Sequence, residues 1–140
     1  MSGSRTVELD IPQGQAVQAV TAALAQQGFG VLTTIDVRAT LKAKLDVDVE
    51  DYVILGACNP PLAHRALSED PQIGLLLPCN VTVRQASGHT VVQAVDPAQL
   101  LSLTTAPDTH CSPELGAVAG DASTRLSAAL DALAAAHGRR

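Results

Sequence analysis

The chain has 140 residues, of which 46% are hydrophobic, with one Phe, one Tyr, no Trp and a formal net charge of −5 at pH 7. This length fits one domain, whose core must be built from aliphatic side chains. Scattered basic residues and the near absence of aromatic rings exclude phosphate-binding stripes and base-stacking platforms, so we expect no nucleic acid as a partner.

The N-terminal stretch MSGSRTVELDIP lacks the basic start and the continuous apolar run of a secretory signal peptide. No apolar run approaches the roughly 20 residues that a membrane-spanning helix requires. The three cysteines are an odd number and do not suggest a disulfide scaffold. We therefore expect a single domain over residues 1–140, located in the cytoplasm, with reduced thiols and no membrane association.

The first predicted elements are a strand, a helix and a second strand. Residues 5–11 alternate apolar with polar side chains, which is typical of a half-buried strand. Apolar residues then recur at helical spacing over 16–24, and Gly28 ends this helix. Residues 30–37 predict the second strand, in which strict alternation places Asp36 on the face away from the two valines.

The middle of the chain predicts a second round of helix and strand. Residues 38–45 are expected to form a short helix, and an acidic loop follows it. Residues 52–58 are apolar enough for a central strand, and 60–70 begins a helix with proline in its first turn. Residues 74–85 predict one long strand, or two strands broken near Pro78.

A hairpin and a long helix complete the chain. The Ser-Gly pair at 87–88 predicts a two-residue turn into a strand at 89–95. Residues 98–112, rich in Thr, Ser and Pro, are expected to form a loop, and 113–136 a C-terminal helix. The order β-α-β-(α)-β-α-β-β-α predicts an α+β domain with a mainly antiparallel sheet and helices on one face.

Two Cys-Asn pairs indicate where a site should lie, because each is set against proline at a strand end or a strand break. Cys58-Asn59 ends one predicted strand, and Cys79-Asn80 directly follows Pro78. Neighbouring strands lie about 5 Å apart, so the two pairs meet if their strands are neighbours. Asn59 could cap the helix that follows it, whereas Asn80 is an amide in an apolar strand that needs partners or a pocket.

The two thiols leave several functions open. Cys58 lies just before a helix start, whose N–H groups favour a thiolate, so a thiol-dependent redox protein is one alternative. A metal-binding or haem-binding protein would use Cys58 and Cys79, with His64 as a further candidate ligand. We assign no metal, because no paired ligand spacing supports one. Free cysteines are commonly small buried apolar side chains, which makes a purely structural motif the last alternative.

Four stretches between residues 28 and 97 form a specific combination: GFGVLTTIDV, LKAKLDVDVEDYVILGACNPPLAHRAL, DPQIGLLLPCNVTV and the Asp-Pro pair at 96–97. Together they resemble a bacterial and archaeal family known as domain-of-unknown-function family 302. The resemblance implies a small α+β domain with a curved antiparallel sheet that forms a homodimer, and it implies no established reaction. The family motif residues in this chain are Asp36, Cys58, Asn59, Pro60, Pro78, Cys79 and Asn80. His110 and Cys111 lie outside the matching part and receive no role.

These observations favour a binding module over an enzyme. We expect a small-ligand binding or sensing protein, with a site that could lie at a dimer interface. The expected ligand-binding residues are Asp36, Cys58, Asn59, Cys79 and Asn80. The sequence identifies no cofactor and no catalytic residue.

Overall fold

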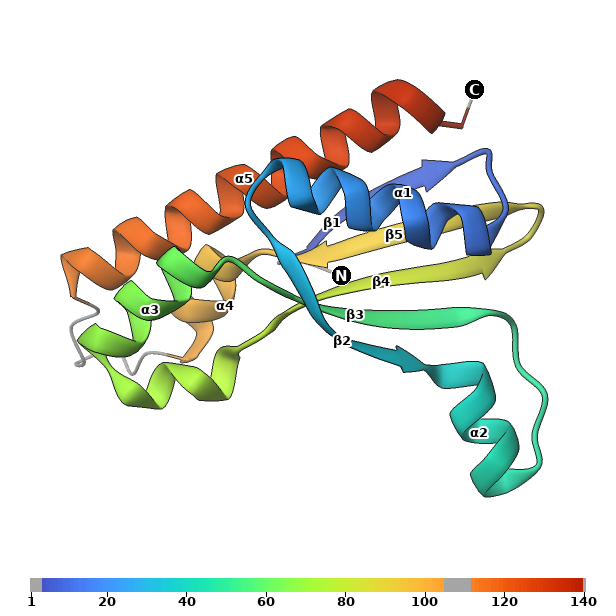
Figure 1. Ribbon diagram of the computed structural model, residues 1–140, viewed down its shortest axis with the longest axis horizontal. Helices are drawn as coiled ribbons and strands as arrows, with labels where there is room; N and C mark the ends of the chain where they lie inside the picture. The colour runs from blue at the N-terminus through green and yellow to red at the C-terminus, as the bar shows by residue number, and fades with distance from the viewer. Residues whose placement is uncertain (1–3, 105–111, 140) are drawn as a thin grey trace.

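The computed structural model describes residues 4–104 and 112–139. The strands are β1 (Ser4–Leu9), β2 (Gly30–Asp36), β3 (Tyr52–Cys58), β4 (Cys79–Ala86) and β5 (His89–Val95). The helices are α1 (Gln13–Gln26), α2 (Val37–Leu45), α3 (Pro60–Glu69), the 3₁₀ helix η1 (Pro71–Leu76), α4 (Pro97–Thr104) and α5 (Pro113–His137) (Figure 1). Within the described ranges, no helix has the length and apolar character that crossing a membrane requires.

The five strands form one open sheet in the order β1-β5-β4-β3-β2, in which every pairing is antiparallel. The edges of the sheet are therefore β1 and β2. The predicted two-residue turn joins β4 to β5, with Gly88 at a φ of 76°. The predicted α+β class with an antiparallel sheet is confirmed.

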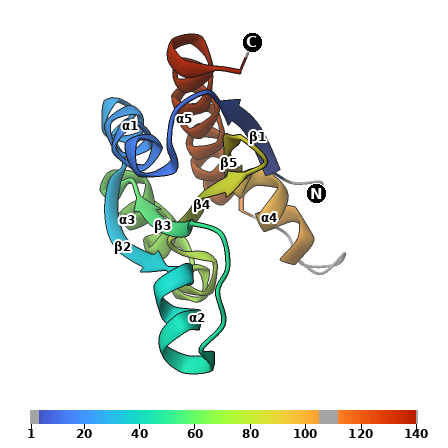
Figure 2. The ribbon, with the colours of Figure 1, turned by 90° about the vertical axis from the view of Figure 1, so that its right-hand side faces the viewer.

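The core lies between one face of the sheet and the helices α1 and α5 (Figures 1 and 2). Most of the wholly buried side chains on this face of the sheet are aliphatic, as the composition requires: Leu9, Leu55, Ala57, Val81, Val83 and Val92. The polar exception is Thr90, whose hydroxyl donates a hydrogen bond of 2.6 Å to the Ile11 carbonyl oxygen. A buried hydrogen bond from Gln13 Nε2 to the Val83 carbonyl oxygen, 3.1 Å long, ties the start of α1 to β4. The helix α2 does not join this core, since none of its residues is buried.

The prediction of a strand over 74–77 is wrong, because the chain forms η1 there and β4 begins only at Cys79. The carboxylate of Asp70 accepts a hydrogen bond of 3.0 Å from the Gln72 N–H, and Pro71 occupies the first helical position. A capping acid followed by proline is a helix-start signal. Here it is stronger than the strand preference of the apolar run that follows it.

The prediction of a loop over 98–112 is wrong for its first part, where α4 runs to residue 104. Asp96 Oδ1 accepts hydrogen bonds from the Ala98 N–H (3.0 Å) and from Ser123 Oγ of α5 (2.5 Å), which caps α4 and ties it to α5. Residues 105–111 of the predicted loop, with His110 and Cys111, lie outside the described residues, and Ser112 caps α5.

The strict alternation predicted for β2 is also wrong. The pairing with β3 shifts between Val31 and Thr33, because Leu32 is an extra residue at a β-bulge. Val31 pairs with Ala57 on the core face, whereas Thr33 pairs with Gly56 on the other face. The extra residue changes which face of the sheet each later side chain of β2 points to. Asp36 therefore lies on the core face instead of the opposite one.

Candidate functional site

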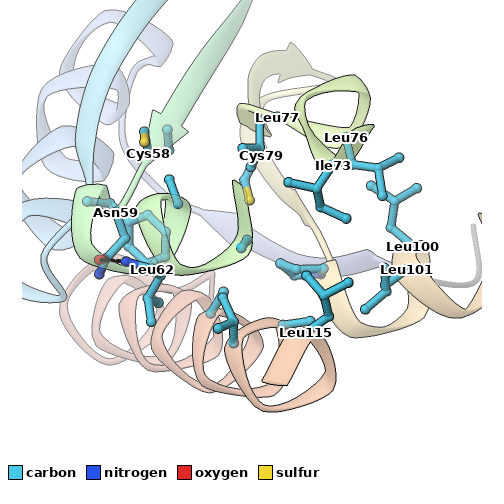
Figure 3. A pocket seen from close by; sticks show the side chains of 18 residues that line it. Cys58, Asn59, Leu62, Ile73, Leu76, Leu77, Cys79, Leu100, Leu101 and Leu115 are labelled. Atoms are coloured by element: carbon cyan, nitrogen blue, oxygen red, sulfur yellow. Dashed lines mark hydrogen bonds between the residues drawn. The ribbon is translucent and has the colours of Figure 1, made fainter. Parts of the chain in front are cut away.

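The two Cys-Asn pairs lie close together, because β3 and β4 are neighbours in the sheet. Ala57 pairs with Cys79 in the antiparallel register, so the end of β3 and the start of β4 share one end of the sheet. A pocket opens at this end between α3, η1, α4 and α5 (Figure 3). Cys58, Asn59 and Cys79 all line it.

The pocket is almost entirely apolar. Its walls include Phe29 at the start of β2, Leu62 on α3, Ile73 on η1, Leu101 on α4 and Leu115 on α5. Its cavity volume is about 70 Å³, several times the space that one water molecule needs. An apolar cavity of this kind offers water few hydrogen-bonding partners, so a small apolar group fits it better than water does.

Asn59 has the capping role that the sequence allowed for it. Its Oδ1 accepts a hydrogen bond of 3.3 Å from the Leu62 N–H, and its Nδ2 donates one of 3.4 Å to the Gln27 carbonyl oxygen. The backbone of Gly28, at a φ of 83°, passes so close that an added Cβ would lie 2.9 Å from Asn59 Nδ2. The amide therefore fastens the start of α3 to the end of α1 and frames one side of the pocket.

Replacing Asn59 with alanine is expected to lower the free energy of unfolding by about 1 kcal/mol, because the cap of α3 and the bond to the Gln27 carbonyl oxygen are both lost. Urea denaturation followed by circular dichroism measures this. Asn80→Ala is the matched control, since Asn80 is exposed and its loss should change stability by less than about 0.5 kcal/mol. Equal losses in the two variants would show that the cap is not what makes Asn59 important.

The two thiols differ in their surroundings. Both cysteines are free, with Cys58 half-buried and Cys79 buried. Burial, with a smaller contribution from the neighbouring Cys58, raises the pKa of the Cys79 thiol to about 11. At neutral pH Cys79 is therefore a neutral thiol and forms part of the apolar wall, which is unfavourable for a nucleophile or a metal ligand.

The three candidate metal ligands do not all meet at the pocket. His64 is exposed on α3 and does not line the pocket that contains Cys58 and Cys79. Across residues 4–104 and 112–139, no three His, Cys, Asp or Glu side chains are grouped as a metal ion would need.

Asp36 and Asn80 lie away from the pocket. Asp36 is at the other end of β2, roughly 17 Å along the sheet at about 3.3 Å per residue, and its Oδ1 accepts a hydrogen bond of 2.9 Å from the Ala39 N–H to cap α2. Asn80 is exposed on the face of the sheet opposite the core. The structure thus brings together Cys58, Asn59 and Cys79 and separates the other two predicted site residues from them.

The sequence did not indicate the walls that η1, α4 and α5 contribute. Ile73 fell between the predicted helix at 60–70 and the predicted strand at 74–85, and Leu101 fell within a predicted loop, so neither was recognised as part of a site. One signal pointed toward them: the Asp-Pro pair at 96–97, which has the form of a helix start and could have revealed α4.

Comparison with known proteins gives one family and a solved structure. The family model described as "Domain of unknown function DUF302" matches residues 5–133. The crystal structure of an uncharacterized conserved protein DUF302 from Bacillus stearothermophilus is 31% identical in sequence, with a TM-score of 0.83, over 95% of this chain and 99% of that chain. None of the curated proteins matches. The solved protein therefore has the same arrangement of strands and helices over its whole length.

Proposed function

Because this chain belongs to the DUF302 family, which names a fold and no reaction, we propose a function from the pocket itself: the protein binds a small apolar ligand, or the apolar end of a larger one, beside Cys58 and Cys79. The observation that carries this proposal is the apolar pocket at the shared end of β3 and β4. A binding module needs such a concave apolar site and needs no catalytic group.

The size of the pocket defines the class of ligand. A cavity volume of about 70 Å³ suits a short alkyl chain, and a small aromatic ring would fill the cavity and extend into its open mouth. Each buried CH₂ group contributes about 0.8 kcal/mol, so a four-carbon chain would gain about 3 kcal/mol before the entropic cost of association. No affinity tighter than the millimolar range is therefore expected for small probes.

The polar groups at the site favour an uncharged ligand. Asn59 already uses its amide oxygen and nitrogen to hold α3 and α1 together. Cys79 is a neutral thiol at physiological pH because burial raises its pKa to about 11. Cys58 is half-buried at the edge of the pocket, and in Figure 3 its sulfur points away from Leu115, so it adds no charge to the cavity wall. An ionic group would find no compensating charge inside and would have to stay at the mouth.

Titration with benzene, followed through the methyl signals of leucine in ¹H–¹³C spectra, tests the proposal. The signals of Leu62, Leu101 and Leu115 should shift and saturate, with a dissociation constant in the millimolar range, because these residues line the pocket. Leu45 is exposed at the end of α2, away from the pocket, and its signals should not move. Unsaturable shifts, or equal shifts at all leucines, would contradict a defined site.

Substitutions that fill the pocket, compared with a control substitution on the surface, test where the ligand binds. Ala63→Phe places a ring in the pocket from α3 and should abolish the benzene shifts, and Ala63→Leu should weaken binding with less disturbance of the fold. Ala135→Phe introduces the same ring on an exposed position of α5 and should leave binding unchanged. Benzene binding that survives both substitutions of Ala63 would place the binding site elsewhere.

The cytoplasm remains the compartment that we propose for this module. Cys58 and Cys79 are both free, which fits a reducing environment. The half-buried Cys58 thiol would be open to oxidation in a secreted protein.

A further inference from the structure

A second concave surface, which we call the α2 groove, lies at the other end of β3 from the pocket beside Cys58. It is an open groove of about 500 Å³ with mostly apolar walls, formed by α2, the loop that follows α2, and the strands β3 and β4. In both views α2 stands away from the other helices (Figures 1 and 2). Tyr52, the first residue of β3, lines the groove, whereas Cys58, the last, lines the pocket. The two sites are therefore separate.

The walls of the α2 groove come from the helix and from the outer face of the sheet. Val37 and Leu41, one turn apart on α2, are the two residues of this helix that are not exposed, and both line the groove. Tyr52 lies directly opposite Arg84 in the pairing of β3 with β4. Because Val83, the residue before Arg84, is buried in the core, Tyr52 and Arg84 share the face away from the core. The groove thus combines apolar walls with one guanidinium.

Contacts at Asp51 and Asp36 hold these walls in place. The Asp51 carboxylate pairs with Arg38 of α2 at 3.1 Å, and the Asp51 carbonyl oxygen accepts a hydrogen bond of 2.8 Å from the Gln85 N–H of β4. Asp36 caps the start of α2, where Val37 lies. The helix and the strand are thus fixed on either side of the groove, and a site whose walls are already in place binds with a smaller entropic cost.

Arg84 is a charge without a partner in a partly buried position. Of the Lys and Arg side chains within residues 4–104 and 112–139, Lys44, Arg65 and Arg84 form no ion pair. Lys44 and Arg65 are exposed, whereas Arg84 is half-buried in the wall of the groove. A charge that is withdrawn from water normally has an opposite charge beside it. A carboxylate would supply one, because a guanidinium binds it through two parallel hydrogen bonds.

Glu50 gives the same groove a negative charge. It is exposed, lines the groove and forms no ion pair within the described ranges. Gln85, also on the wall, donates its side-chain N–H to the Ala86 carbonyl oxygen at 3.0 Å, which leaves its amide oxygen to accept. A simple anion would be repelled by Glu50, and a simple cation by Arg84. A ligand with one charge of each sign and an apolar part complements all of these groups.

We propose that the α2 groove binds a small zwitterion with an apolar side chain, which is the chemistry of a free apolar amino acid. Its carboxylate lies at Arg84, its ammonium group lies toward Glu50, and its side chain packs against Leu41 and Tyr52. The volume of about 500 Å³ falls within the roughly 300–1,000 Å³ of small-molecule sites. This site takes a charged ligand and the pocket beside Cys58 takes an uncharged one, so neither proposal depends on the other.

Titration with L-leucine, followed through the methyl signals of valine and leucine in ¹H–¹³C spectra, tests the site. The signals of Val37, Leu41 and Val49 should shift and saturate, with a dissociation constant in the millimolar range. The signals of Leu62 and Leu115 should not move, because these residues line the separate apolar pocket. Shifts that do not saturate by about 50 mM would overturn the proposal, and so would saturation at Leu62 and Leu115 alone.

Two analogues of leucine that each lack one charge test the choice of a zwitterion. Isocaproate keeps the carboxylate and isopentylamine keeps the ammonium group. Each should bind about tenfold more weakly than L-leucine or worse, because one charge-assisted hydrogen bond is lost and one unpaired charge of the groove repels the ligand. If isocaproate binds as tightly as L-leucine, Glu50 has no part in recognition and the zwitterion is the wrong class of ligand.

Substitution of Arg84 tests the position of the carboxylate. Arg84→Gln should raise the dissociation constant of L-leucine about tenfold, and Arg84→Lys, which keeps the charge, should raise it less. Arg65→Gln is the matched control, because Arg65 is also unpaired among the described residues but is exposed on α3, outside the groove. Circular dichroism verifies that each variant is folded. Equal affinities of Arg84→Gln and Arg65→Gln would overturn the proposal.

Discussion

Replacing Gly56 with alanine is expected to lower the free energy of unfolding by about 3 kcal/mol. Gly56 lies in β3 between Thr33 of β2 and the chain that leads into β4. A Cβ added there would collide with Thr33 Oγ1 and would lie 2.8 Å from Pro78 Cγ. Thr33 Oγ1 can turn away by rotation of its side chain, but the Pro78 ring belongs to the chain directly before β4, so relieving the second clash requires that chain to move.

Urea denaturation of Gly56→Ala and Gly30→Ala measures this effect. Gly30 is the matched control, because it lies in β2 and an added Cβ would meet nothing within 4 Å. Gly30→Ala should be neutral or should stabilise the protein by up to about 1 kcal/mol, since alanine restricts the unfolded chain. Adding Thr33→Ala to Gly56→Ala should recover only part of the loss, because Pro78 remains. If both alanine variants are as stable as the wild type, the close approach at Gly56 has no energetic weight.

Gly56 also connects the stability of the sheet to the proposed function. Pro78, which lies over Gly56, directly precedes Cys79 on the pocket wall. Moving Pro78 away to admit a methyl group would displace the start of β4. Benzene should therefore bind Gly56→Ala more weakly than Gly30→Ala, even in conditions where both variants are fully folded.

The fold could be predicted where local signals agree with tertiary packing. In β4 the alternation of Cys79, Val81 and Val83 with polar residues gave the correct core face, because the strand has a period of two and no bulge. The start of α5 was also predictable, since Ser112 accepts a hydrogen bond of 3.1 Å from the Leu115 N–H as a capping serine does.

The fold could not be predicted where a single residue or a contact distant in sequence determines the local structure. Leu32 is an extra residue in β2, and no composition rule marks it as a bulge. The helix α4 depends on Asp96, which also binds Ser123 of α5, 27 residues away in the sequence. A pattern read along the chain does not contain that contact, so the Thr, Ser and Pro content of the segment was misleading.

The candidate site also has one part that could be predicted from the sequence and one part that could not. Cys58 and Cys79 could be placed together because their strands are close in sequence and pair directly. The remaining walls of the pocket come from helices that are distant in sequence, and only the packed chain brings them together. Asn80 follows Cys79 directly and therefore points to the opposite face, which alternation alone already implied.

Raising the pH from 8 to 11 is expected to lower the free energy of unfolding by about 2 kcal/mol through the single thiol of Cys79. Its pKa is raised from the ordinary 9.0 to about 11, chiefly by burial. Between these two values the unfolded chain loses the thiol proton while the folded chain keeps it, so the unfolded state is favoured as the pH rises. The stability is fully present below pH 9 and is lost as the pH passes through about 11.

Urea denaturation in the presence of a reductant, at steps between pH 8 and 11, isolates this effect by comparison with Cys79→Ala. Lysine and tyrosine titrate in the same range in both proteins, so the difference between the two profiles reports the thiol. Cys79→Ala should be less stable at pH 8, where it leaves a small cavity, and the wild type should lose about 2 kcal/mol of this advantage by pH 11. Cys58→Ala should retain most of the pH dependence, since burial is the larger cause. Parallel profiles for the wild type and Cys79→Ala would show that burial does not raise the pKa of the Cys79 thiol. A wild type that gains stability relative to Cys79→Ala as the pH rises would show a lowered pKa, and a stabilised thiolate would favour the thiol-dependent alternative over the binding of an uncharged ligand.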